Sequence, residues 1–160
     1  MSYYRFLENT QISTNACIQT VQVDTVQNIK HQQITHVLAI HDQSQISLGA
    51  HRNRIRTAEF GVVGTKKDPG LYVHPTLLVD AILGVPIGWG DIQIFKRNPE
   101  NKTKLERKYQ TLPFEDKESR YWRDAIQNTS SAIPEVILTF VADRESDIFE
   151  VWEAFDARRT

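Results

Sequence analysis

The sequence predicts a mixed α/β fold in which a strand, a β-hairpin, a helix, a second strand and a final helix follow one another. Three observations indicate this order. Two short apolar runs, 34–40 and 136–142, are rich in β-branched residues and are typical of buried strands. Between them, residues 71–95 hold two strand-like runs separated by a turn. Apolar residues then recur at helical spacing in 117–129 and again near the end of the chain.

The chain before the first predicted strand is polar and rich in glutamine, asparagine and threonine. Ser13 is a suitable N-cap for a helix in this region. That helix would place three side chains on one face: Ala16, Cys17 and Val21. A strand over 34–41 follows. Residues 44–70 are polar and contain glycines and a turn sequence, so we expect a long connection without regular structure.

Residues 71–79 and 85–95 predict a β-hairpin whose turn lies at 80–84. Pro86 has no N–H and limits pairing on one side of its strand. The expected core side chains of the hairpin are Leu77, Val79, Val85 and Ile87. We also favour a core position for Trp89 over an exposed platform.

A charged connection over 96–115 leads to Asp116, which can cap a helix over 117–129. The buried face of that helix would hold Trp122, Ala125 and Ile126. After the strand at 136–142, three apolar side chains recur at i, i+4 and i+7. These are Ile148, Trp152 and Phe155, and they predict a terminal helix with one apolar stripe.

With 160 residues and 40% apolar residues, the chain can form one domain with a hydrophobic core. The net charge of −1 does not indicate a nucleic-acid or membrane partner. The charge is unevenly distributed, because 52–67 and 96–108 are basic whereas 143–156 is acidic. This pattern suits a protein that binds a phosphate backbone and a metal ion; the alternative is a solvated surface with local charge runs.

Cys17 is the only cysteine, so an intrachain disulfide is impossible and a reducing compartment is expected. No apolar run approaches the roughly 18–20 residues that span a bilayer. The first residues do not have the form of a signal peptide. We therefore expect a cytoplasmic protein without a membrane partner.

Two aspartates directly follow the two predicted buried strands. Asp42 comes after the first and Asp143 after the second. If the strands are neighbours in one sheet, the carboxylates meet at one edge, and a divalent cation would relieve their repulsion. Such a pair suits phosphoryl transfer with Mg²⁺, or with Mn²⁺ in its place. The alternative is that each aspartate is a turn or cap residue.

Other chemistries lack the necessary residues. The five histidines show no metal-binding spacing, and we interpret them as surface or hydrogen-bonded structural groups. Ser44 and Ser47 lie near His41 and Asp42, but no nucleophile elbow surrounds them. Phosphate-binding glycine loops are absent from the sequence.

Five blocks resemble, in order, the catalytic core of bacterial DDE transposases of the insertion-sequence-four group, which includes transposon-five-like enzymes. The strongest is VADRESDI at 141–148, which is similar to the D-R-E-A-D block. The others are YRFL at 4–7, LAIHD at 38–42, YVH with LL at 72–78, and DKES with a tryptophan at 116–122.

The resemblance implies an incomplete ribonuclease-H-like mixed sheet in which Asp42 and Asp143 are the first two acidic metal ligands. It implies cleavage of a DNA phosphodiester by water, followed by strand transfer of the 3′-hydroxyl. It also suggests Arg5 as a DNA contact. The candidate DNA contacts of the first basic segment are Arg52, Arg54, Arg56, Lys66 and Lys67. The implied partners are transposon-end DNA and either a second copy or a full-length transposase.

The sequence departs from the family pattern at two points. Gln43 and Ser44 stand where the family often has two threonines. The Y-x2-R-x3-E-x6-K block that carries the third acidic ligand is not found. We therefore expect residues 1–33 to be a remnant of the linker from a DNA-end-binding domain, and 34–160 to be the N-terminal part of a catalytic core. This predicts little or no transposition by the chain alone.

Two alternatives remain beside this hypothesis. The chain could be a non-catalytic module that binds DNA through its basic segments or inhibits a full-length transposase. It could also be an unstable remnant whose sheet lacks its last strand and covering helix, which would leave a strand edge exposed and favour aggregation or dependence on a partner.

Overall fold

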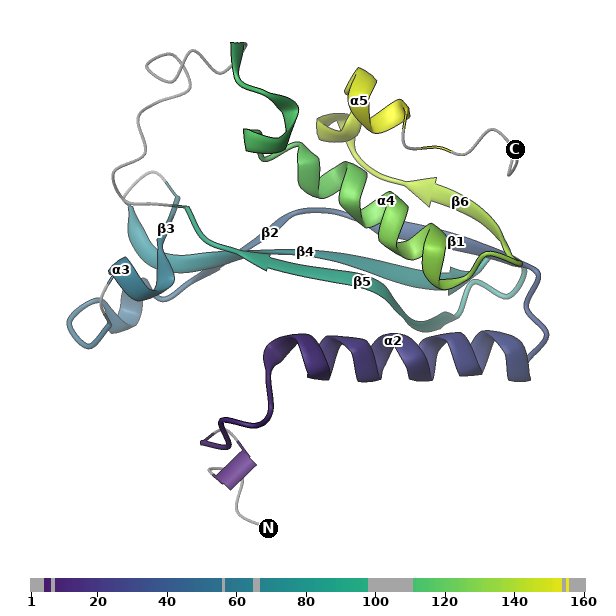
Figure 1. Cartoon of the computed structure of the whole chain (residues 1–160), viewed down its shortest axis with the longest axis horizontal. Helices are drawn as coiled ribbons and strands as arrows, with labels where there is room; N and C mark the ends of the chain where they lie inside the picture. Colours follow the sequence, from purple (N-terminus) through teal and green to yellow (C-terminus); the bar gives the residue numbers. More distant parts are fainter. Residues whose placement is uncertain are drawn as a thin grey trace.

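The computed structural model describes residues 5–6, 8–55, 57–64, 67–97, 111–153 and 155. The centre of the protein is a six-stranded mixed sheet (Figure 1). Its strands are β1 (His36–His41), β2 (Ser44–Ser47), β3 (Val62–Val63), β4 (Asp68–Asp80), β5 (Pro86–Phe95) and β6 (Ile137–Val141). The mixed α/β class predicted from the sequence is confirmed.

The helices include two long ones, α2 (Thr14–His31) and α4 (Arg120–Ala132). The short helices are α3 (Thr57–Phe60), α5 (Phe149–Trp152), and the 3₁₀ turns η1 (Gly49–His51), η3 (Phe114–Asp116) and η4 (Arg144–Ser146). Among the described residues, no helix combines the length and the apolar character needed to cross a membrane.

Strand β4 organises the sheet. It is 13 residues long and pairs antiparallel with β1, β2, β3 and β5. Strand β1 then pairs on its other side with β6, and this pairing is parallel. Across its widest part the sheet therefore has the order β5–β4–β1–β6.

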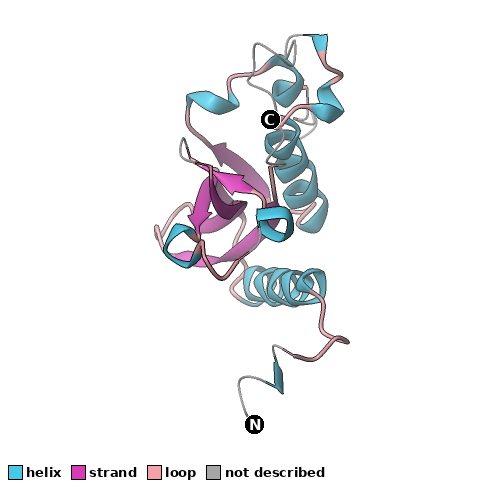
Figure 2. Cartoon of the chain, turned by 90° about the vertical axis from the view of Figure 1, so that its left-hand side faces the viewer, coloured by secondary structure: helices cyan, strands magenta, loops and turns pink. Residues whose placement is uncertain are grey.

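The two long helices cover the same face of the sheet (Figure 2). On this face Ile29 of α2 packs with Val37 and Ala39 of β1, and both strand residues are fully buried. Trp122 and Ile126 of α4 form a second cluster against Phe140 of β6. Burying such apolar side chains is the main favourable contribution to folding, at about 25 cal/mol per Å² of apolar surface.

Within the described residues, neither long helix covers the opposite face of the sheet, although many of its side chains are also apolar. The strand registers align one row across four strands, namely Trp89, Leu77, Ile40 and Val141. Trp89 and Leu77 are half-buried, whereas Ile40 and Val141 are exposed. We refer to this surface as the open face.

Helix α2 begins as predicted, because the Ser13 side chain accepts a hydrogen bond from the Ala16 N–H at 3.1 Å. The face that holds Ala16, Cys17 and Val21 is not the side that α2 buries in the core. Ala16 and Val21 are exposed, whereas Thr25 and Ile29 are buried against β5 and the core. Thr25 fits there because its hydroxyl donates to the Val21 carbonyl and accepts from the Trp89 N–H.

The hairpin of β4 and β5 exists, and Val79 is buried as expected. Val85 is 46% exposed, so its predicted core position was wrong. The reason is the turn. The Asp80 side chain accepts hydrogen bonds from the N–H groups of Ile82 and Leu83, and Gly84 has a left-handed φ of 67°. This geometry holds Ile82, Leu83 and Val85 in solvent.

Two further expectations were wrong. Residues 44–70 are not an irregular connection, since they contain β2, η1, α3 and β3 beside β4. Helix α4 begins at Arg120, and Asp116 belongs to the preceding 3₁₀ turn rather than to its cap. Its predicted buried face is correct, because Trp122, Ala125 and Ile126 are all buried.

The predicted terminal helix is short. Its buried side chain is Val151, whereas Trp152 is 60% exposed and Phe155 is 40% exposed. The i, i+4, i+7 pattern therefore does not mark a core-facing stripe here. Residues 98–110, which are most of the charged connection over 96–115, and residues 156–160 lie outside the described residues.

Gly88 tests how tightly α2 packs against β5. A Cβ atom at this position would lie 2.1 Å from the Thr25 hydroxyl oxygen, and Thr25 is itself buried. We expect Gly88→Ala to destabilise the protein by roughly 1–3 kcal/mol through overpacking. Urea unfolding followed by circular dichroism measures this change. In the Thr25→Ala background the same substitution should cost clearly less, and equal costs in both backgrounds would show that the clash is not the cause.

Candidate functional site

The carboxyl ends of β1 and β6 bring Asp42 and Asp143 to one edge of the sheet. The parallel register runs from His36 opposite Ile137 to Ile40 opposite Val141. Asp42 and Asp143 each follow the last paired residue of their strand by two positions, so both lie at the carboxyl end of this strand pair.

Both aspartates are exposed to water and each commits one oxygen to the backbone. Asp42 Oδ1 accepts from the Gln43 N–H at 2.7 Å. Asp143 Oδ1 accepts from the Glu145 N–H at 2.8 Å and so caps η4. Asp143 is therefore a cap residue, as one of the two interpretations predicted. The hydrogen bond orients its carboxylate through Oδ1 and does not involve Oδ2.

The described residues do not supply a complete acidic ligand set. No group of three or more histidine, cysteine, aspartate or glutamate side chains within them is arranged to hold a metal ion. Asp42 and Asp143 are therefore two carboxylates without a third beside them in the described part of the chain. Octahedral Mg²⁺ keeps several water ligands, so two exposed carboxylates can anchor it but hold it weakly.

A buried aromatic layer lies behind Asp42. Nδ1 of His41 is 3.2 Å from Nε2 of His74, and both imidazoles are buried. The Trp122 ring meets both imidazoles edge-on, with centroid distances of 5.1 Å and 4.6 Å. Phe140 of β6 closes the layer at 5.7 Å from His41. The layer joins β1, β4, β6 and α4 directly beneath the edge that carries the aspartates.

Burial lowers the pKa of both histidines to about 4. The Asp42 carboxylate opposes this shift at His41, and the proximity of His41 reinforces it at His74. Both rings are therefore neutral at pH 7 and share one hydrogen bond. Nδ1 of His74 has no hydrogen-bond partner among the described residues. The pair is a structural, hydrogen-bonded group, as we interpreted these histidines.

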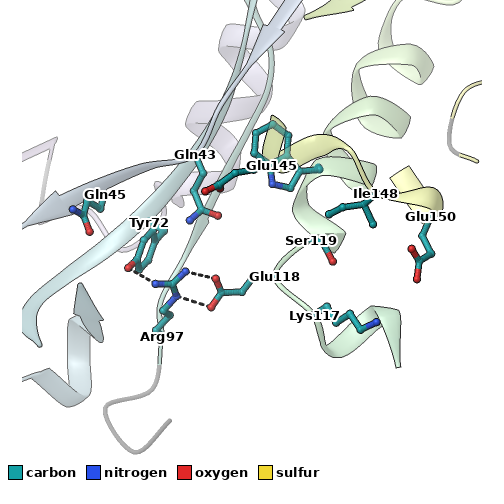
Figure 3. A pocket seen from close by; sticks show the side chains of 11 residues that line it. Gln43, Gln45, Tyr72, Arg97, Lys117, Glu118, Ser119, Glu145, Ile148 and Glu150 are labelled. Carbon is teal, nitrogen blue, oxygen red and sulfur yellow. Dashed lines mark hydrogen bonds and ion pairs between the residues drawn. The ribbon is translucent and has the colours of Figure 1, made fainter. Parts of the chain in front are cut away.

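A cavity of about 770 Å³ opens beside the same edge of the sheet (Figure 3). Gln43 and Glu145, which follow the two aspartates, both line it. Its far wall consists of Tyr72 from β4, Arg97 after β5, and Glu118 and Trp122 from the region of α4. The cavity therefore joins the end of the sheet to the beginning of α4.

Arg97 holds this far wall together. Its guanidinium donates to both carboxylate oxygens of Glu118 and to the Tyr72 hydroxyl, and it lies 4.1 Å from the centre of the Tyr72 ring. Burial disfavours its charge, but the hydrogen bonds and charge of Glu118 outweigh this effect and raise the pKa of Arg97. Arg97 is thus engaged within the protein rather than displayed to a ligand.

The basic candidates are distributed over two places. Arg52, Arg54 and Lys67 are exposed on the segments around η1 and β3, beyond the carboxyl end of β1. Arg52 forms an ion pair with Asp68. Arg5 is exposed on the N-terminal segment, which projects away from the sheet (Figure 1). Arg56 and Lys66 lie outside the described residues.

Sequence reasoning did not identify the ion pair of Arg97 with Glu118 or the contact of His41 with His74. No short-range pattern marks either, because the partners come from different elements. The weak signal available was the strict alternation along β4, which places Tyr72, His74 and Thr76 on one face.

Comparison of the chain with protein-family models and with curated proteins finds no match.

The buried histidine pair predicts a loss of stability in acid. The pKa of each group is about 4 in the folded protein and about 6.5 when unfolded. The unfolded chain therefore binds more protons between these values, and stability should fall as the pH drops from 6.5 to 4. The loss is up to about 3 kcal/mol for each histidine. Urea unfolding at several pH values measures it.

Two variants identify the source of this dependence. His74→Leu should flatten the stability profile between pH 6.5 and 4. His51→Asn alters an exposed residue and should retain the wild-type profile. A His74→Leu profile as steep as that of the wild type would assign the acid sensitivity to other groups.

Proposed function

We propose that this chain is a DNA transposase of the DDE type, related to the insertion-sequence-four group, with Asp42 and Asp143 as its first two acidic ligands. The observation that carries this proposal is the register of β1 and β6, which brings these two residues to one edge. Nothing in local sequence requires that meeting. It follows only if the two strands are parallel neighbours, as the proposed lineage demands.

The sheet order supports the same proposal. Three antiparallel strands, β1, β4 and β5, precede a helix and a fourth strand that returns parallel to β1. In this proposal the order β5–β4–β1–β6 forms the first part of a ribonuclease-H-like sheet. Asp42 and Asp143, which follow the parallel strands β1 and β6, would be its first two acidic ligands.

The chemistry of the two aspartates suits a hard divalent cation. Both are exposed carboxylates, and Mg²⁺ prefers oxygen ligands while keeping bound water. When bound, Mg²⁺ would supply Lewis-acid activation for cleavage of a phosphodiester. Asp42 and Asp143 would anchor it, and the hydrogen bonds to the N–H groups of Gln43 and Glu145 hold their carboxylates in place.

In this proposal the other residues have two roles: one group supports the aspartates and another binds DNA. The layer of His41, His74, Trp122 and Phe140 excludes water from beneath the aspartates. Arg52, Arg54 and Lys67 lie beyond the same end of the sheet, where they can bind the phosphate backbone. A cytoplasmic location and transposon-end DNA as the partner belong to this proposal.

Metal binding tests the proposal directly. We expect Mn²⁺ to bind with a dissociation constant on the order of a millimolar, since only two carboxylates anchor it. Asp42→Asn and Asp143→Asn should each reduce this binding at least about tenfold, because each removes one of two charges. Calorimetric titration or the relaxation of water protons by Mn²⁺ provides the measurement.

Asp147→Asn is the matched control, since this exposed residue lies on the same loop. It should leave Mn²⁺ binding unchanged. Nicking of supercoiled DNA with Mg²⁺ or Mn²⁺ should be slow and should vanish in Asp143→Asn. Rapid nicking that survives this substitution would refute the assignment of the site.

A second candidate function is DNA binding without catalysis. It is favoured by the incomplete acidic set among the described residues, together with the basic side chains beyond the same edge. In this case the chain would occupy transposon ends or pair with a complete transposase, and the aspartates would be dispensable.

Salt dependence separates the two functions. Duplex DNA binding should weaken with added salt by a slope of about 0.9 for each phosphate contact. Arg54→Ala and Lys67→Ala should each lower that slope by about one, whereas Lys30→Ala on α2 should not. Fluorescence anisotropy measures the affinities. Binding retained by the Asp42→Ala, Asp143→Ala double variant would favour the non-catalytic function. If the wild-type chain does not bind DNA even at low salt, both proposed functions are wrong.

A further inference from the structure

Strand β6 pairs on one side only among the described strands, with β1. The Ile137 N–H donates to the Thr35 carbonyl at 2.9 Å, so Ile137, Thr139 and Val141 direct their backbone groups toward β1. The N–H and C=O groups of Leu138 and Phe140 therefore point to the other edge. Figure 1 shows β6 as the outermost strand of this side of the sheet, with α5 near its carboxyl end.

This edge lacks the devices that usually prevent strand pairing. From Val136 to Ala142 there is no charged residue and no proline, and the register with β1 has no bulge. Short length is its one protective feature. An uncharged, regular edge strand is a template for another strand.

Exposed apolar side chains flank the edge on both faces of the sheet. On the open face, Ile137 is 58% exposed and Val141 is also exposed. On the helical face, Phe140 contacts Phe155 at a ring distance of 5.6 Å, and Trp152 of α5 projects beyond it into solvent. The backbone edge of β6 thus has exposed apolar side chains beside it on both faces.

We propose that β6 pairs antiparallel with β6 of a second copy of this chain, around a two-fold axis at Thr139. The backbone N–H and C=O of Leu138 in each copy would form two hydrogen bonds with the C=O and N–H of Phe140 in the other. The two such pairs give four hydrogen bonds in total. Thr139 would then face Thr139 of the second copy as a non-hydrogen-bonded pair. This inference does not depend on the proposed function.

The side-chain pattern fits a second copy rather than an unrelated strand, because it is symmetric about Thr139. The exposed Ile137 falls opposite Val141 of the second copy, so each copy covers the exposed aliphatic residues of the other on the open face. On the helical face Leu138 falls opposite Phe140, next to Phe155. A two-fold interface requires such self-complementarity.

The charges at the ends of the strand predict how the dimer responds to salt. Glu135 would approach Asp143 of the second copy at both ends of the paired strands. This repulsion lies at the solvent-exposed rim, where salt screens it. Added salt should therefore strengthen the dimer, whereas it weakens any binding to DNA.

Cysteine cross-linking tests the register. In a Cys17→Ser background, Thr139→Cys should form a disulfide-linked dimer on mild oxidation, because the Cα atoms of such a pair are about 4.5 Å apart. Ile137→Cys and Val141→Cys should not cross-link with themselves, but their mixture should. Failure of Thr139→Cys to cross-link, or self-linking by Ile137→Cys, would overturn the proposal.

Sedimentation equilibrium provides an independent measurement. The unmodified chain should dimerise with a dissociation constant on the order of micromolar. Leu138→Pro removes an outward N–H and leaves the ladder to β1 intact, so it should raise this constant at least about tenfold through two lost hydrogen bonds. If Leu138→Pro does not fold, Val141→Lys places a charged side chain opposite the apolar Ile137 of the second copy and should have the same effect. The inference would be refuted if the wild-type chain remained monomeric at a concentration about 100-fold above this dissociation constant.

Discussion

The parallel contact between β1 and β6 is the constraint on which the rest of the structure depends. Strand β1 lies between an antiparallel partner and a parallel one, and its side chains Val37 and Ala39 are fully buried. A parallel partner requires a long connection that crosses the sheet. Helix α4 provides that crossing, and its apolar face covers the sheet. The position of Asp42 and Asp143 is thus a result of how β6 returns to β1.

A buried aromatic layer supports the carboxyl ends of β1 and β6, whereas the carboxylates of Asp42 and Asp143 are exposed to water. The imidazoles of His41 and His74 share one hydrogen bond and pack against Trp122, so three elements converge below the aspartates. Within the described part of the chain, the two carboxylates accept hydrogen bonds from the N–H groups of Gln43 and Glu145 rather than from that layer. Apolar and aromatic packing therefore supports this end of the sheet, while both carboxylates stay exposed to solvent.

The features that could be predicted from sequence depend on local pattern. The strand at 136–142, the hairpin and the Ser13 cap follow from β-branched runs, turn residues and capping chemistry. The buried face of α4 follows from its helical spacing. The face of α2 could not be predicted in this way, because Thr25 is buried through a close approach to Gly88 that lies far along the chain. Similarly, β2 and β3 exist because β4 is long enough to pair with them, and nothing in 44–70 alone indicates that.

The candidate site shows the same division. The occurrence of an aspartate after each buried strand is visible in the sequence, and their meeting requires only that the strands be neighbours. The network of Arg97, Glu118 and Tyr72 could not be anticipated, since its members belong to three segments joined by tertiary packing. The apolar stripe after Asp143 was misleading because Val151, rather than Trp152 or Phe155, enters the core.

The turn between β4 and β5 exposes aliphatic side chains at the end of the sheet opposite the aspartates. Asp80 fixes the backbone at Ile82 and Leu83, so these side chains cannot fold back, and they are 81% and 69% exposed. They lie at the amino end of β1, opposite the ionic end that carries Asp42 and Asp143. The two ends of the sheet therefore differ in polarity, with exposed aliphatic side chains at the hairpin turn and exposed carboxylates at the carboxyl ends of β1 and β6.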